Sequence, residues 1–225
     1  MPSDAFNAPG QRSHIARRPK PSKLDLVTDA PPRDRLIEEA SKAFRSEGYS
    51  AANLGRIATA AGISKTTIYK HVASKADLFA MVVEDSIRHS DLTDAVLKPE
   101  PDEDARATLR RALLGMTALA LSPDGLATYR MISRELPHFP ELVEAYNRAL
   151  APFFQGLVRF LATQHDKGWL AISSPEWAAR MLVNMVLADA RREALLGRDP
   201  APQPSQQARL VDDALELFLQ GAVRR

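Results

Sequence analysis

Apolar residues recur at helical spacing along most of the chain after residue 32. The first stripe ends before Gly48 and consists of Leu36, Ile37, Ala40, Ala43 and Phe44. Steps of three and four residues place these side chains on one face of a helix of about 14 residues. Glycine is a frequent stop signal, because it adopts backbone conformations that other residues avoid. The pattern predicts an amphipathic helix that ends at Gly48.

Three short helices are predicted after Gly48. Asn53, Ser64 and Ser74 each precede an apolar stretch, and their side chains are of the types that accept hydrogen bonds from the first N–H groups of a helix. The helix after Asn53 is expected to end at Gly62. The helix after Ser74 is expected to bury Leu78, Phe79, Val82 and Val83.

Beyond residue 101 the helical pattern continues in longer segments. Candidate helices cover roughly residues 103–121, 124–136, 140–165, 175–196 and 205–223, and segments such as SPDG and LPHFP separate them. No stretch alternates with a period of two for long enough to indicate a strand. We therefore predict an all-α chain. A three-helix helix-turn-helix domain at residues 33–80 precedes a helical regulatory and dimerisation domain at residues 81–225.

Charge is unevenly distributed, although the net charge is only +2. Residues 54–79 carry four basic side chains and one acidic one, whereas residues 84–104 carry eight acidic and two basic ones. Residues 1–32 are rich in proline and hold five basic side chains between residues 11 and 23. We predict a disordered basic arm there, which either contacts DNA beside the helix-turn-helix or remains an idle tail. A polyanion would meet the N-terminal third of the chain.

Composition excludes several classes of protein. Hydrophobic residues make up 45% of the chain and charged residues 26%, which is typical of globular proteins. Without cysteine the chain has no disulfide, thiolate metal ligand or cysteine nucleophile. It also lacks a phosphate-binding loop, a nucleophile elbow and a paired His/Glu metal motif, so we expect no enzyme, no cofactor and no metal. No apolar run reaches the roughly 20 residues of a membrane span, and we expect a cytoplasmic protein.

The segment between Leu54 and Val72 has the composition of a helix-turn-helix. Small residues at Ala58 and Gly62 allow two short helices to approach closely, and Gly62 follows the first helix, where a positive φ is common. Inward-facing apolar residues would lock the pair; they are Ile57, Ala61, Ile63 and Ile68. The second helix then presents hydroxyls in its first turn and cations further along. Such a helix can read base edges with the hydroxyls and hold phosphates with the rest.

Residues 33–79 resemble the N-terminal DNA-binding domain of the TetR family of bacterial transcription regulators. The resemblance rests on FRSEGYS followed by LGRIATAAGISKTTIYKHVASKADLF, with Val72 where the family usually has phenylalanine. It implies that the DNA-contacting residues are Asn53, Lys65, Thr66, Thr67, Tyr69, Lys70, His71 and Lys75. Further along, TYRMISRELPHFPELVEAYNRAL and DKGWLAISSPEWAARMLVNMVLADARREALLG resemble the C-terminal domains of AcrR-like and AefR-like members.

The last two predicted helices carry apolar stripes that suit a homodimer, because the family pairs these helices between subunits. The expected interface residues are Trp177, Met181, Asn184, Ala188, Leu210, Val211, Ala214, Leu217 and Phe218. A ligand pocket for a small-molecule effector would be lined by Leu113, Met116, Thr117, Tyr129, Met131, Phe139, Phe154 and Met185. The same stripes are also typical of plain core packing.

The predicted partner is double-stranded DNA with a palindromic operator, since a two-fold dimer presents two recognition helices one helical turn apart. Release of a repressor by its effector is the usual outcome in the family. The alternative is an architectural protein that binds DNA without sequence specificity. The two differ in sequence preference and in salt dependence.

Overall fold

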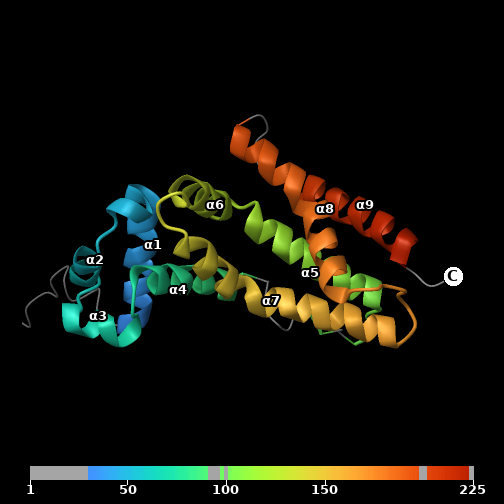
Figure 1. Ribbon diagram of the computed structural model, residues 1–225, viewed down its shortest axis with the longest axis horizontal. Helices are drawn as coiled ribbons and strands as arrows, with labels where there is room; N and C mark the ends of the chain where they lie inside the picture. Colours follow the sequence, from blue (N-terminus) through green and yellow to red (C-terminus); the bar gives the residue numbers. More distant parts are fainter. Residues whose placement is uncertain (1–29, 91–96, 99–100, 198–201, 223–225) are drawn as a thin grey trace, which may run out of the picture. The chain divides into compact units, whose positions relative to one another are not determined.

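The computed structural model describes residues 30–90, 97–98, 101–197 and 202–222. Over these residues the chain forms nine α-helices and no β-strand, which confirms the all-α prediction (Figure 1). The helices are α1 (Pro32–Ala51), α2 (Leu54–Ala60), α3 (Lys65–His71), α4 (Lys75–Arg88), α5 (Ala105–Ala120), α6 (Pro123–Glu135), α7 (Glu141–Asp166), α8 (Pro175–Leu196) and α9 (Pro204–Ala222). The predicted arm at residues 1–32 lies almost entirely outside the described residues.

The predicted capping residues begin their helices as expected. The Asn53 side chain accepts hydrogen bonds from the backbone of α2, Ser64 caps α3, and Ser74 caps α4 by accepting from the Asp77 N–H. Each cap satisfies a backbone donor that the first turn of a helix leaves unpaired. Helix α8 likewise begins after a capping Ser174 and ends at Gly197, which adopts a left-handed φ of 68°.

Gly48 breaks α1 rather than ending it. Its φ of 81° and ψ of 172° lie outside the helical region, and helical geometry resumes as far as Ala51. This combination of angles is almost confined to glycine. Space is limited as well, because a Cβ atom at Gly48 would lie 2.5 Å from Nη2 of Arg134. The break turns the buried Tyr49 into the core beneath α1.

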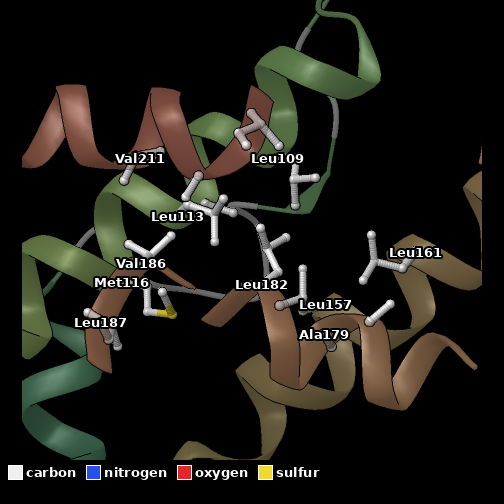
Figure 2. Packing of buried hydrophobic residues seen from close by; sticks show 14 of the residues in the cluster. Leu109, Leu113, Met116, Leu157, Leu161, Ala179, Leu182, Val186, Leu187 and Val211 are labelled. Carbon is white, nitrogen blue, oxygen red and sulfur yellow. The ribbon is translucent and has the colours of Figure 1, made fainter. Parts of the chain in front are cut away.

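Two hydrophobic clusters divide the described helices. We call Pro32–Arg88 the head and Ala105–Ala222 the body. The head cluster extends into the body, because it includes residues of α6 and of the first half of α7; these are Met131, Ile132, Leu142, Ala145 and Ala149. The body cluster joins α5, α8 and α9 to the second half of α7 (Figure 2). The proposed domain border at residues 80 and 81 falls inside α4.

Helix α4 connects head and body along its length. It lies against α7, while α9 lies against α5 (Figure 1). Two ion pairs join the same parts: Arg148 of α7 bonds Asp77 of α4 at 2.9 Å, and Arg45 of α1 bonds Asp124 of α6 at 2.7 Å. Helices α6 and α7 of the body are therefore in direct contact with α1 and α4 of the head. Among the described helices, none has the length and hydropathy that a membrane span requires.

Candidate nucleic-acid interface

Residues 61–64 form the turn between α2 and α3. Gly62 has a φ of 66°, as its sequence position predicts, and no atom outside its immediate neighbours approaches within 4 Å of where its Cβ would be. The Ile63 N–H donates to the Ala58 carbonyl at 2.9 Å. This bond satisfies a carbonyl that the end of α2 would otherwise leave free. The turn thus fixes the direction in which α3 leaves α2.

Helix α3 is attached to the head through one fully buried side chain. Ile68 is 0% exposed and is the buried residue of α3. Side chains on the other faces are exposed to solvent; they are Lys65, Thr66, Tyr69, Lys70 and His71. Tyr69, the aromatic residue of α3, is 53% exposed. The structure therefore gathers six of the eight predicted DNA-contacting residues on one short helix, and five of the six are exposed.

Thr67 and Asn53 differ from those five because each also supports a helix end. The Thr67 side chain is half-buried, and its hydroxyl lies 2.8 Å from the Ser64 hydroxyl. The Asn53 side-chain oxygen accepts from the N–H groups of Gly55 and Arg56 at 2.9 and 3.1 Å. Both remain at the edge of the exposed surface, but part of their hydrogen-bonding capacity is used within the head.

Lys75, the last of the predicted DNA-contacting residues, is hydrogen-bonded within the fold. Its ammonium group donates to the carbonyls of Tyr49, Ser50 and Ala52 at 2.8, 3.2 and 3.2 Å. These carbonyls belong to the last turn of α1 and the residue after it, where a helix leaves acceptors unpaired and where a cation is favourable. The sequence reasoning missed this because the carbonyls lie 23 to 26 residues earlier in the chain.

Aromatic rings complete the environment of Lys75. Its nitrogen lies 4.5 Å from the centroid of the Tyr49 ring and 5.7 Å from that of Phe139. Burial lowers the pKa of Lys75, and the carboxylates of Glu135 and Glu141 act in the opposite direction. Burial also raises the pKa of Tyr49 to about 12. Lys75 of α4 thus contacts both the end of α1 and the segment before α7, and it links these elements.

The exposed surface of α8 carries an apolar stripe, in contrast to that of α3. Trp177 is 68% exposed, Met181 60% and Met185 38%, and Asn184 and Ala188 are also exposed. From α9, Leu217 is 64% exposed. Large apolar side chains at this spacing form a stripe along α8 that no described part of the chain covers.

Two residues predicted for the dimer interface lie instead inside the subunit. Val211 is 0% exposed and Ala214 is 5% exposed, and both belong to the body core beside α5. Leu210 and Phe218 are half-buried. One apolar stripe of α9 faces the core, whereas Leu217 lies on another side of the helix and is exposed. Both sides carry apolar residues, so the periodicity of the sequence does not show which side is buried within the subunit.

The residues predicted to line a ligand pocket do not come together around one cavity. Leu113, Met116 and Thr117 are packed in the body core, and Figure 2 shows Leu113 and Met116 among side chains of α8 and α9. Phe139 packs edge-on against Tyr49 at 5.2 Å in the head core. The remaining four are Tyr129 beneath Arg191, Phe154 beneath Arg180, Met131 in the head core and Met185 at the surface.

A measurable cavity lies elsewhere, between α1, α4 and α6. It has a volume of about 470 Å³, and of the eight predicted pocket residues only Met131 lines it. The Arg45–Asp124 ion pair stands at its edge, and its two partners are 79 positions apart in sequence. No local pattern in the sequence could have indicated this pairing.

Two family models match the chain and together cover most of the described helices. Residues 36–82 match the model described as bacterial regulatory proteins of the tetR family. Residues 107–221 match the model described as the C-terminal domain of AefR-like transcriptional repressors. The first match contains the turn and α3 described above, and the second contains nearly all of the body.

Known proteins resemble the chain to different extents. The transcriptional activator FasR of Mycolicibacterium smegmatis is 41% identical over 59 residues, which span only 26% of this chain and 26% of FasR. The transcriptional repressor SCO4008 of Streptomyces coelicolor is 29% identical over 156 residues, 64% of this chain and 76% of that protein. A TetR-family regulator from Mesorhizobium loti superposes with a TM-score of 0.70 at 24% identity, covering 86% of this chain and 97% of its own. At that identity the superposition shows a shared fold.

Proposed function

This chain belongs to the TetR family of bacterial regulatory proteins, and from that premise we propose that it is a repressor bound as a homodimer to a palindromic operator. A small-molecule effector would release it from the DNA. The exposed face of α3 is the observation that carries the proposal. Its helix is anchored by the buried Ile68 and directs hydroxyls, an aromatic ring and cations to solvent.

The two ends of α3 suit different parts of DNA. Thr66 lies in the first turn, where a hydroxyl and a methyl group can contact base edges in the major groove. Tyr69 and Lys70 lie further along, where they can hold phosphate oxygens and fix the register of the helix. The proposal assigns no phosphate contact to Lys75, whose ammonium group is bonded within the head.

The apolar stripe on α8 supports a two-fold dimer. A second copy that covers Trp177, Met181 and Leu217 would remove large apolar surfaces from water, which is favourable by about 25 cal/mol per Å². The same residues of each copy would meet across a two-fold axis. Such a dimer presents two α3 helices, and simultaneous binding to two half-sites raises affinity and demands a fixed spacing.

Repression is favoured over activation by the description of the C-terminal match, AefR-like transcriptional repressor, which covers residues 107–221. The relatives themselves include a named activator and a named repressor. An effector that shifts the body would change the separation of the heads, because α4 packs along α7. A palindromic site penalises such a shift, since both half-sites must be matched at once.

The experiment compares binding to the upstream region of its own gene with binding to random DNA of equal length, at two salt concentrations. A sequence-specific repressor protects a palindrome and binds it about 10³-fold or more tightly than random DNA. An architectural protein binds both alike, with a steep dependence on salt. Equal affinity for the two DNAs would reject the proposal in favour of that alternative.

A further inference from the structure

The cavity between α1, α4 and α6, which we call the junction groove, has an apolar floor. Phe44 of α1 is 4% exposed, Phe79 of α4 is 1% exposed, and Met131 of α6 is 8% exposed. Val82 extends this surface along α4. A volume of about 470 Å³ is within the range of small-molecule sites. The floor can therefore accept a compact aromatic or aliphatic group.

Three arginines and two acidic residues line the junction groove. Arg45, Arg130 and Arg134 line it from α1 and α6. Arg45 is paired with Asp124, and Arg134 bonds Glu135 at 3.1 Å. Among the described residues, Arg130 donates to a backbone carbonyl alone, that of Ala194, at 2.8 Å.

The other acidic residue of the lining, Glu47, is paired with Arg56. Within the described part of the chain no carboxylate pairs with Arg130. The lining thus holds one arginine, Arg130, that no carboxylate of the described residues neutralises, above an apolar floor.

We propose that the junction groove is a regulatory site for a compact amphipathic organic anion. The apolar part of the ligand would lie on Phe44, Phe79 and Met131, and its carboxylate would bind the guanidinium of Arg130. Planar guanidinium groups bind carboxylates with two parallel hydrogen bonds, which gives this class of ligand an advantage over neutral molecules of the same shape. The site is separate from the body-core residues Leu113, Met116 and Thr117.

The walls of the groove give such a ligand a means of acting on the head. One wall is α1, which belongs to the head, and another is α6, which belongs to the body. The Arg45–Asp124 bond joins them across the edge of the groove. A ligand between these walls, with its carboxylate on Arg130, changes the contact between α1 and α6 that the Arg45–Asp124 bond spans. Ligand binding itself does not depend on the proposed function, whereas its effect on DNA binding rests on it.

The first experiment measures binding of 2-naphthoate to the full chain without DNA, by calorimetry or ligand-observed NMR. A ligand with about 13 non-hydrogen atoms is expected to bind with a dissociation constant on the order of 1 mM. The neutral analogue 2-naphthalenemethanol should bind about tenfold more weakly, because it lacks the charge that Arg130 recognises. Absence of naphthoate binding at roughly ten times that concentration would overturn the proposal.

Two matched variants locate the site. The Ser86 hydroxyl donates to the Val82 carbonyl and the Ser133 hydroxyl to the Tyr129 carbonyl, each four residues back on an exposed helical surface. Only Ser86 lines the groove. Ser86→Trp should weaken naphthoate binding at least tenfold, while Ser133→Trp should leave it within twofold. Equal effects of the two variants would place the ligand elsewhere and reject the groove.

A third variant does not depend on a bulky substitution. Arg130→Gln keeps a polar side chain with N–H donors and removes the charge. It should abolish the preference for naphthoate over the neutral analogue while leaving the affinity for the analogue unchanged. An undiminished preference would overturn the role of Arg130. These binding results stand even if no operator is found, so failure of the site and failure of the repressor proposal are distinguishable.

Discussion

Helices α3 and α8 both leave one face outside the core, but the two faces have opposite chemistry. The exposed face of α3 carries hydroxyls and cations around Tyr69. That of α8 carries Trp177, Met181 and Met185. Charged and hydroxyl groups are well hydrated and cost nothing when left in water, whereas an apolar stripe is favoured to find a cover.

The difference indicates which kind of partner each face suits. A polyanion brings phosphates to a cationic face and releases its counterions, so that interaction weakens with salt. An apolar face binds through burial of surface and is far less sensitive to salt. Each face can therefore be tested by a change that affects one interaction and leaves the other intact.

The largest effect is expected from Trp177→Glu combined with Met181→Glu. Four carboxylates would meet in the proposed dimer interface, where an unpaired charge costs several kcal/mol. Sedimentation should show a monomer, and operator affinity should fall on the order of 100-fold because one half-site is lost. The matched control, Gln155→Glu with Arg159→Glu, changes two exposed positions four residues apart on α7 and should remain dimeric. If the double variant remained dimeric, the exposed face of α8 would not be part of the interface.

Lys75→Met tests whether Lys75 stabilises the fold or contacts DNA. The substitution leaves the carbonyls of Tyr49, Ser50 and Ala52 without their shared donor. We expect the free energy of unfolding to fall by about 2 kcal/mol, measured by urea denaturation. The salt dependence of DNA binding should be unchanged. A shallower salt slope would show that Lys75 reaches phosphate after all.

Thr66→Ala tests the reading of bases by α3. Removal of the hydroxyl and methyl groups should reduce discrimination between the operator and random DNA by about 1–2 kcal/mol. The free energy of unfolding should change little, since Thr66 is exposed. Fluorescence anisotropy on both DNAs measures this difference. An equal loss on both would mean that Thr66 does not contact base edges.

Lys70→Ala is expected to give the smallest change, roughly 1 kcal/mol or less per subunit at physiological salt. The loss should be the same for operator and random DNA, because a phosphate contact carries no sequence information. The slope of log affinity against log salt should become shallower by about one unit per lost contact. A slope identical to that of the unchanged protein would exclude Lys70 as a phosphate-binding residue.

The sequence predicted the helices well because their end signals are local. Residues 175–196 were expected as a helix and form α8 with the same limits, set by Ser174 and Gly197. The orientation of α3 was also predictable, since Ile68 alone is apolar on its inward side and is fully buried. In a short helix with one large apolar residue on its inward side, that residue determines which side of the helix packs against the core.

Long-range features could not be predicted in this way. An apolar stripe shows that Leu113 and Met116 face inward, but it does not show whether the opposite wall fills the space, and here it does. The sequence also does not show whether a lysine that follows a capping serine binds phosphate or backbone carbonyls. Lys75 binds carbonyls that lie more than 20 residues earlier in the chain. Both depend on how separate elements pack, which one sequence does not encode locally.

Helix α7 runs from Glu141 to Asp166 although Pro152 stands within it. Proline has no N–H, so the carbonyl of Arg148 lacks its helical donor at that point. Ala149 packs into the head core and Phe153 into the body core, so the missing bond coincides with the transition between them. Amide hydrogen exchange should therefore divide this helix into two protection classes, one that opens with the head and one that opens with the body.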